Sequence, residues 1–381
     1  MALIDKREFV GLEGVAHLCT GGEAPWLASH TEACARFGAL KSAGMAGREE
    51  MFVIGERARA RAARILGVET AEVAFLAHAS EGLNQAVRSV EWHAGDNVVF
   101  ADLEYPSLIY PAAVLRERGV ESRVVRTRDH YLSLDDLAAR VDRRTRLVLV
   151  SQVSYLTGQR LDLHRCSDIA QAVGARLAVD ATHAAGVVPV PGGVCDFVVS
   201  SCYKWLLATH GVGLFGYSAR RVGPLVPATV GWHSVGHRGG PGDPLAMPWR
   251  PDASRLEAGN PSLLGLAVLD NALARLEGLA AEAVERHAVG LGGRLIEGLR
   301  SRGFTVLTPE APAERAGNVC FLADDAVGLA RRLAALRVLV WGGEGRIRVS
   351  PHVHCDGDDV ERFLEALDRV DARPGPALAA R

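Results

Sequence analysis

Short apolar runs alternate with helix-like stretches through the middle of the chain, and this alternation limits the folds that the chain can adopt. The runs are apolar at consecutive positions, which is typical of strands buried on both faces of a parallel sheet. Helices that join such strands must cover both faces. We therefore expect an α/β fold with strands at 97–101, 122–126, 147–152, 175–180, 196–200 and 212–217, and with helices that include 79–90, 108–118 and 163–173.

A loop rich in Gly and Pro at 235–253 separates this region from a second one. A helical stretch at 262–300 follows, and the glycines at 290–293 predict an interruption in it. Strand-like and helix-like segments then alternate at 305–308, 319–322, 325–336, 338–341, 346–350 and 358–370. We expect a large domain over 21–260, a smaller α+β C-terminal domain over 261–371 on which segment 1–20 packs, and a disordered tail over 372–381.

The composition narrows the possible functions. The 381 residues carry a net charge of −2 with no long basic run, so neither nucleic acid nor an anionic membrane is expected as a partner. No apolar run approaches the length of a membrane span, and the charged N-terminus lacks a signal-peptide core. The seven cysteines are scattered, without a CxxC pair. This pattern argues against a disulfide framework or a zinc site, and it predicts a cytoplasmic protein with no bound metal.

Lys204 and Asp180 carry the clearest chemical signal. Asp180 ends one predicted strand, and Lys204 closely follows the next. Ligands of open α/β sheets gather at such strand ends. A lysine forms an imine with the aldehyde of pyridoxal 5′-phosphate (PLP), and a buried carboxylate keeps the ring nitrogen protonated, so that the ring stabilises a carbanion at Cα. Taken singly, such residues are more often a solvated lysine and a helix cap.

Three further segments support a cofactor site. Ala79 and Ser80 lie where a loop enters a helix, and free N–H groups with a hydroxyl could hold a phosphate there, although Ser80 could equally be a plain N-cap. Tyr105 follows a strand, where its ring could stack on a cofactor ring. Ser154 follows another strand in the run Val153–Gly158.

In order and spacing, these segments resemble the class-V branch of the fold-type-I PLP-dependent enzymes, which includes cysteine desulfurases, isopenicillin-epimerase-like proteins and kynureninases. The resemblance covers roughly residues 15–370. It implies a seven-stranded, mostly parallel sheet in the large domain and a homodimer with a shared active site. Tyr203 before Lys204, and Asn260-Pro261 where desulfurases usually have Gly-Thr, are closer to kynureninases.

The resemblance also implies a role for each matching residue. Lys204 would bind the cofactor covalently, Asp180 would bond the pyridine nitrogen, and His183 would lie near the ring hydroxyl. Arg348 would bind the substrate carboxylate, with Arg346 as the competing candidate. The other cofactor-binding candidates, partly contributed by a partner subunit, are Ala79, Ser80, Tyr105, Ser154, Ser201, Tyr203, Trp232 and Asn260.

Two motifs suggest other functions less well. The GxGxxG pattern at 211–216 lies inside a predicted strand and does not open a helix, which argues against dinucleotide binding. The run His352-Val353-His354-Cys355 lacks a fourth metal ligand and is expected to be structural. Many relatives have Tyr-Asn where His354-Cys355 stands, so the substrate preference stays open.

The resemblance leaves several reactions possible. Cysteine desulfurases place a cysteine on a loop before the carboxylate-binding arginine, but residues 334–344 contain none, and Cys355 lies after Arg348. We therefore expect kynureninase-like cleavage at Cβ of an L-amino acid, or the closely related carbon–sulfur lyase reaction, through an external aldimine and a quinonoid. The alternatives are an aminotransferase or epimerase of the same branch, and a catalytically idle PLP-binding regulatory protein.

Overall fold

A seven-stranded sheet forms the centre of the computed structural model, which describes residues 1–236, 247–370, 372 and 374–375. The strand order is β2-β8-β7-β6-β5-β3-β4, and β8 pairs antiparallel with both β2 and β7, while the other pairs are parallel. This confirms the predicted α/β fold. The strands are β2 (Val73–Leu76), β3 (Asn97–Ala101), β4 (Glu121–Val125), β5 (Thr145–Ser151), β6 (Arg176–Asp180), β7 (Phe197–Ser201) and β8 (Gly213–Tyr217).

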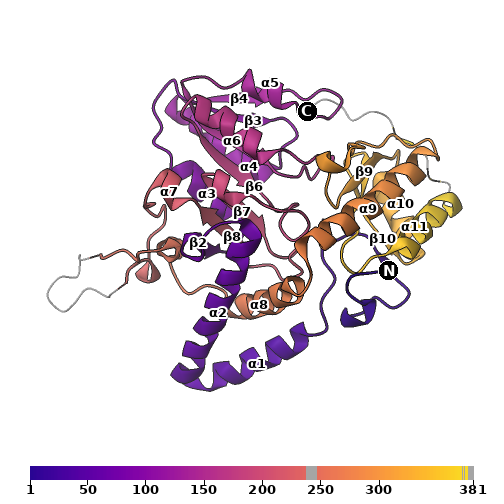
Figure 1. Cartoon of the computed structure of the whole chain (residues 1–381), viewed down its shortest axis with the longest axis horizontal. Helices are drawn as coiled ribbons and strands as arrows, with labels where there is room; N and C mark the ends of the chain where they lie inside the picture. Colours follow the sequence, from indigo (N-terminus) through magenta and orange to yellow (C-terminus); the bar gives the residue numbers. More distant parts are fainter. Residues whose placement is uncertain (237–246, 371, 373, 376–381) are drawn as a thin grey trace.

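Helices cover both faces of the sheet (Figure 1). Neighbouring residues of a strand point to opposite faces, so they pack against different helices. Val98 packs in the cluster that contains α3 (Ala79–Arg88) and α4 (Pro106–Ala113), whereas Val99 packs with α5 (Leu134–Ala138) and α6 (Leu163–Ala172). The rest of the face that carries Val99 is covered by α2 (Gly44–Leu66) and α8 (Leu263–Glu277), and α1 (His30–Ser42) packs against both of these helices. The short α7 (Ala219–Val222) follows β8.

The C-terminal elements enclose a separate apolar cluster and include a three-stranded antiparallel sheet of order β11-β12-β9. Ala16 and Leu18 of the N-terminal segment belong to this cluster, and β1 (Ala16–His17) pairs with β10 (Val338–Leu339), so the N-terminus lies beside these elements (Figure 1). The domain bounds at 20 and 260 stay predictions. The remaining elements are α9 (Ala281–Arg300), β9 (Val319–Leu322), α10 (Ala326–Ala335), β11 (Trp341–Gly343), β12 (Arg346–Val349) and α11 (Gly357–Arg369).

Two expectations about local structure are wrong. The glycines at 290–293 lie inside α9, and the helical stretch breaks at 278–280 instead. A Cβ on Gly292 would lie 3.5 Å from Val319 of β9, an ordinary contact distance, so α9 packs against β9 at this position. Residues 305–308 form only an isolated bridge, from Val306 to Phe321, and no strand. Residues 237–246 of the expected loop and most of the expected tail (373 and 376–381) lie outside the described residues.

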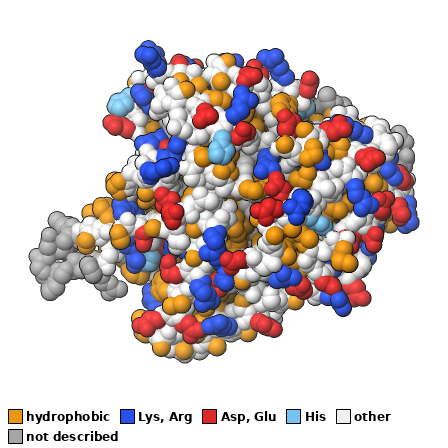
Figure 2. Space-filling model, in the orientation of Figure 1, with side chains coloured by type: hydrophobic (Ala, Val, Ile, Leu, Met, Phe, Trp, Pro, Cys, Tyr) orange, Lys and Arg blue, Asp and Glu red, His pale blue; other side chains and the backbone are white. Residues whose placement is uncertain are grey.

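The surface carries both signs of charge. Figure 2 shows acidic and basic side chains interspersed over the visible face, in keeping with the net charge of −2. In the part of the chain that the structure describes, no helix combines the length and the apolar character that a membrane span requires.

Candidate active site

The segments that follow the central strands meet at one edge of the sheet, around Lys204. Asp180, Ser151 and Ser201 are the last residues of β6, β5 and β7, and the pairing of these parallel strands brings their ends together. They border a cavity of about 130 Å³. Its lining consists of His78, Ala79, Ser80, Tyr105, Ser107, Ser151, Val153, Tyr155, Asp180, Thr182, His183, Ser201, Tyr203 and Lys204.

His183 holds the Lys204 amine in place. Its Nε2 lies 3.2 Å from Lys204 Nζ, while its Nδ1 faces Trp205 Nε1 at 3.3 Å and the Asn318 amide nitrogen at 2.9 Å. An indole N–H can only donate, so Nδ1 is the acceptor and Nε2 carries the proton. Burial keeps the pKa of His183 well below its usual range. Burial and the charge of Arg348 lower the pKa of Lys204 to about 8. In its unprotonated form, the amine can accept a hydrogen bond from the Nε2–H of His183.

Asp180 presents a buried carboxylate to the same cavity. The Thr182 N–H donates to its Oδ1 at 2.8 Å, and the Thr182 side chain also hydrogen-bonds this carboxyl group. Burial raises the pKa of Asp180, and the nearby Lys204 lowers it. An N–H cation placed against Oδ2 would therefore stabilise the ionised carboxylate. Glu104 lies behind this site, bonded to the Ser151 N–H at 2.9 Å and to its hydroxyl, and burial raises its pKa to about 7.

The start of α3 lies at one end of the cavity. His78 caps the ten-residue helix by accepting from the Glu81 N–H at 3.0 Å, and Ala79 and Ser80 begin its first turn. A Cβ on Gly213 would lie 2.4 Å from the His78 carbonyl carbon, so glycine is required for β8 to approach this turn. The Ser80 hydroxyl donates to Ser107 at 2.7 Å. Free N–H groups and hydroxyls at a helix start suit a phosphate.

Arg348 on β12 lies behind the lining of this cavity, in contact with Tyr155, which is part of that lining. The side chain is only 4% exposed, and its Nη1 and Nη2 donate to the carbonyls of Tyr155 at 3.1 Å and Gly21 at 3.0 Å. Its Nε has no partner among the described residues. A Cβ on Gly21 would lie 2.6 Å from Asn318 Oδ1 and 3.3 Å from Arg348 Nε. Position 21 therefore favours glycine, which lets the N-terminal segment approach Asn318 and Arg348 closely.

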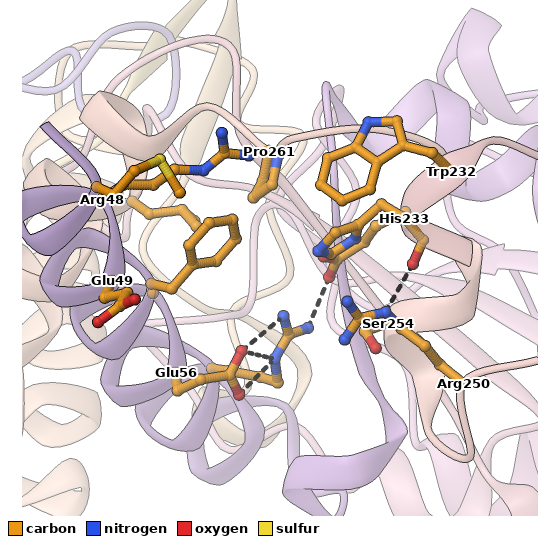
Figure 3. Close-up of a pocket in the computed structure, with 14 residues that line it drawn as sticks. Arg48, Glu49, Glu56, Trp232, His233, Arg250, Ser254 and Pro261 are labelled. Carbon is orange, nitrogen blue, oxygen red and sulfur yellow. Dashed lines mark hydrogen bonds and ion pairs between the residues drawn. The ribbon is translucent and has the colours of Figure 1, made fainter. Parts of the chain in front are cut away.

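Three predicted cofactor residues lie elsewhere in the single chain. The Ser154 hydroxyl accepts from the N–H groups of Leu156 and Thr157, both at 3.2 Å, and caps its own turn. Asn260 accepts from Arg48 at 2.9 Å. Trp232 borders a larger hollow of about 560 Å³, with α2 residues on the opposite wall (Figure 3). That hollow has no lysine in its lining, so the smaller cavity is the better candidate for amine chemistry.

Sequence reasoning did not assign Ser107, Tyr155 or Asn318 to the site. Ser107 stands beside Tyr105 in the quoted segment, and a hydroxyl at the start of α4 is the signal that could have identified it. Tyr155 lies next to Ser154 and, unlike Ser154, lines the cavity. Asn318 is remote in sequence, and only the fold brings it to His183.

The GxGxxG pattern and the His352–Cys355 run both form part of the packed fold. Residues 213–216 of the GxGxxG pattern lie in β8 (Gly213–Tyr217). His352 Nε2 and His354 Nε2 lie 3.0 Å from the carbonyls of Trp205 and His17, and Cys355 donates to His17 as well. Over the described ranges, no three His, Cys, Asp or Glu side chains are grouped as metal ligands.

The donor set around Lys204 fits PLP. Lys204 would bind the cofactor covalently, Oδ2 of Asp180 would accept from the ring nitrogen, and Ala79 with Ser80 would hold the phosphate. Tyr105, whose ring centroid lies 5.9 Å from Lys204 Nζ, would cover the ring. When bound, PLP supplies an electron sink for negative charge developing at Cα.

Comparison with known sequences agrees with this chemistry. Residues 36–334 match the family described as aminotransferase class-V. A cysteine desulfurase from Salmonella choleraesuis is 28% identical over 340 residues, which cover 83% of this chain and 82% of that protein. An uncharacterized protein from Schizosaccharomyces pombe is 29% identical over 261 residues, which cover 66% of this chain and 60% of that protein.

Solved structures share the fold over nearly the whole chain. C-DES with glycine covalently linked to its PLP cofactor has a TM-score of 0.88 and 23% identity, with 96% of this chain and 99% of that chain covered. The apo cysteine desulfurase of Thermococcus onnurineus has a TM-score of 0.86 and 20% identity, with 96% of both chains covered. The chain thus belongs to the class-V aminotransferase family and is a PLP-dependent enzyme.

Proposed function

We propose that the protein cleaves a bond at Cβ of an L-amino acid, and that a carbon–sulfur lyase reaction fits the site best. The observation that carries this proposal is the short hairpin before Arg348. Only Glu344 and Gly345 separate β11 from β12, and neither the strands nor this turn contains a cysteine to accept sulfur. An elimination needs a carboxylate-binding group and a base but no thiol acceptor.

The residues around the cavity can share this work. Arg348 would hold the α-carboxylate, which sets the orientation of the bonds at Cα. Lys204, when not joined to the cofactor, would take the Cα proton, and its pKa of about 8 suits a base that works near neutral pH. His183 would hold the amine in its unprotonated form, because its Nε2–H points at Lys204 Nζ.

The similarity to a cysteine desulfurase supports sulfur-containing substrates, as does the fold shared with a cystine C–S lyase solved with its product, cysteine persulfide. A kynureninase-like hydrolysis at Cβ would use the same residues, and Tyr203 and Asn260 favour it. All seven cysteines are unpaired, which supports our proposal of a cytoplasmic enzyme.

Cysteine desulfuration is the second candidate, because of Cys19. Its Sγ and Arg348 Nη2 would lie 3.2 Å and 3.6 Å from a Cβ built on Gly22, so the thiol is close to the carboxylate-binding group. Burial, however, raises the pKa of Cys19, which disfavours the nucleophilic thiolate.

A substrate panel with product analysis tests the proposal. The holoenzyme is mixed with L-cysteine, L-cystine, an S-alkyl cysteine and L-kynurenine. Elimination yields pyruvate and ammonia, together with sulfide from cysteine, a thiol from the S-alkyl cysteine or cysteine persulfide from cystine. Desulfuration yields alanine and a persulfide on Cys19, and kynurenine hydrolysis yields anthranilate and alanine. Cys19→Ser should abolish desulfuration only. Keto acid formed solely by amino-group transfer would contradict cleavage at Cβ.

We also propose a homodimer in which the partner completes the phosphate end of each site. Apolar side chains lie exposed around the larger hollow, including Met45 and Trp232 at 67% and 47%. Clustered exposed apolar groups commonly mark an association surface. Sedimentation should give a dimer, and a fully active monomer would contradict the shared site.

A further inference from the structure

We propose that Arg346 binds a second acid group of the substrate, so that the preferred substrates are amino acids whose side chain carries a carboxylate beyond Cβ. This inference rests on the proposed function, in which Arg348 binds the α-carboxylate, and it names the substrate class. Arg346 and Arg348 are two residues apart on β12, so their side chains leave the same face of the strand, with Cα atoms about 6.6 Å apart.

Arg346 is buried with its hydrogen-bonding capacity largely unused. The residue is 0% exposed, and its Nη1 donates to Glu344 at 2.6 Å. Its Nε and Nη2 have no partner among the residues that the structure describes. These two nitrogens present parallel N–H groups, which is the edge of a guanidinium that binds a carboxylate in bidentate fashion. A buried charged group left in this state is costly unless an anion completes it.

The aromatic neighbours place the Arg346 guanidinium group near the cavity. Both guanidinium groups lie against Trp341, at 4.7 Å for Arg346 and 5.0 Å for Arg348. Arg346 also lies 5.3 Å from the ring of Tyr155, which lines the cavity together with Lys204. Arg346 therefore lies next to a side chain that lines the cavity of Lys204.

The charges in this region also favour a second anion. Arg346 and Arg348 are both buried, and Glu344, whose side chain is 43% exposed, forms an ion pair with Arg346. Like charges so close together destabilise each other unless ligands compensate them. A monocarboxylate bound at Arg348 would leave Arg346 with Glu344 alone, whereas a dicarboxylic substrate would supply one acid group for each arginine.

Two matched probes test this inference on the holoenzyme. Glutarate and valerate have the same five-carbon chain and differ in one terminal carboxylate, and neither has an amine that could react with the cofactor. By isothermal titration calorimetry, the native protein should bind glutarate at least about tenfold more tightly than valerate. Arg346→Met should remove this preference and leave valerate binding unchanged, while Arg348→Met should weaken both.

Glu344→Gln provides a test that leaves both arginines in place. Removal of the competing carboxylate should tighten glutarate binding severalfold and leave valerate binding unchanged, whereas a merely structural Arg346–Glu344 pair predicts no gain. This variant decides the question if Arg346→Met does not fold. Equal native affinities, loss of both ligands in Arg346→Met, or no gain in Glu344→Gln would overturn the inference. Failure of the substrate panel alongside an intact glutarate preference would instead count against Cβ cleavage.

Discussion

Lys204 should react with aldehydes at a lower pH than an ordinary lysine. Burial, then the charge of Arg348, lowers its pKa from 10.5 to about 8, and the charges of Asp180 and Glu23 act in the opposite direction. At pH 7 an amine with a pKa of 8 is unprotonated in about one molecule in ten, against about one in 3,000 for a pKa of 10.5. The reactive fraction of Lys204 is therefore roughly 300-fold larger than that of a solvated lysine.

The assay is the rate at which the apoprotein captures PLP between about pH 6 and 10. Absorbance follows the reaction, and borohydride reduction with peptide mass spectrometry identifies Lys204 as the labelled residue. The rate should reach half its maximum near pH 8. Arg348→Met should move this midpoint upward, because it removes a repelling charge. Asp180→Asn should move it downward, because it removes an attracting one.

The opposite signs make this test specific. A general loosening of the site would shift both variants toward the solvated value, whereas the electrostatic argument requires them to diverge. Arg331→Met, on the exposed surface of α10, is the matched control and should leave the midpoint unchanged. A native midpoint above about 9.5, or shifts of equal sign in the two variants, would refute the reasoning.

Three other outcomes follow from the same structure. Arg348→Ala should lose about 2–5 kcal/mol of transition-state stabilisation, a fall of roughly 30- to several-thousand-fold in kcat/KM, and Arg348→Lys should recover little of this loss. Steady-state kinetics measure the effect. If kcat/KM falls in Arg346→Ala and not in Arg348→Ala, the α-carboxylate is bound by Arg346 instead. Asp180→Asn should retain the yellow cofactor but lose about 100-fold or more in turnover, so near-native turnover would remove Asp180 from the reaction. Burial lowers the pKa of His352 from 6.5 to about 4, so below pH 6.5 the unfolded chain takes up a proton that the native protein does not. Stability is therefore kept above pH 6.5 and lost as the pH falls toward 4. From pH 7 to 5 the native protein should lose about 2 kcal/mol more than His352→Gln in urea unfolding, and equal losses would contradict this.

The sequence determined the central sheet and the positions of its strand ends. Strands buried on both faces must be apolar at consecutive positions, and six strands were predicted within two residues of their observed bounds. Of these six, β4 is the one that is largely not buried, and only its two valines are apolar. The four-residue β2 was missed, because so short a run has no pattern of its own. The long α1 and α2 were not among the helices named in advance. Their weak segregation of apolar from polar residues explains this, since helix prediction depends on such segregation.

The spacing of Asp180 and Lys204 along the chain also determined the chemistry, because consecutive parallel strands bring their ends to one edge regardless of how the rest of the chain packs. Other members of the site depended on contacts that no local pattern encodes. Gly21 meets Arg348, 327 residues away, only because the N-terminal segment packs on the C-terminal elements.

Packing likewise decided which candidates share the cavity. Tyr155 lines it while its neighbour Ser154 turns back to cap its own loop, a difference set by backbone direction within one turn. Trp232 and Asn260 match the family pattern but lie outside the cavity of the single chain. The unused N–H edge of Arg346 is also a tertiary property. It arises because burial excludes water from the guanidinium while Glu344 reaches only one of its nitrogens.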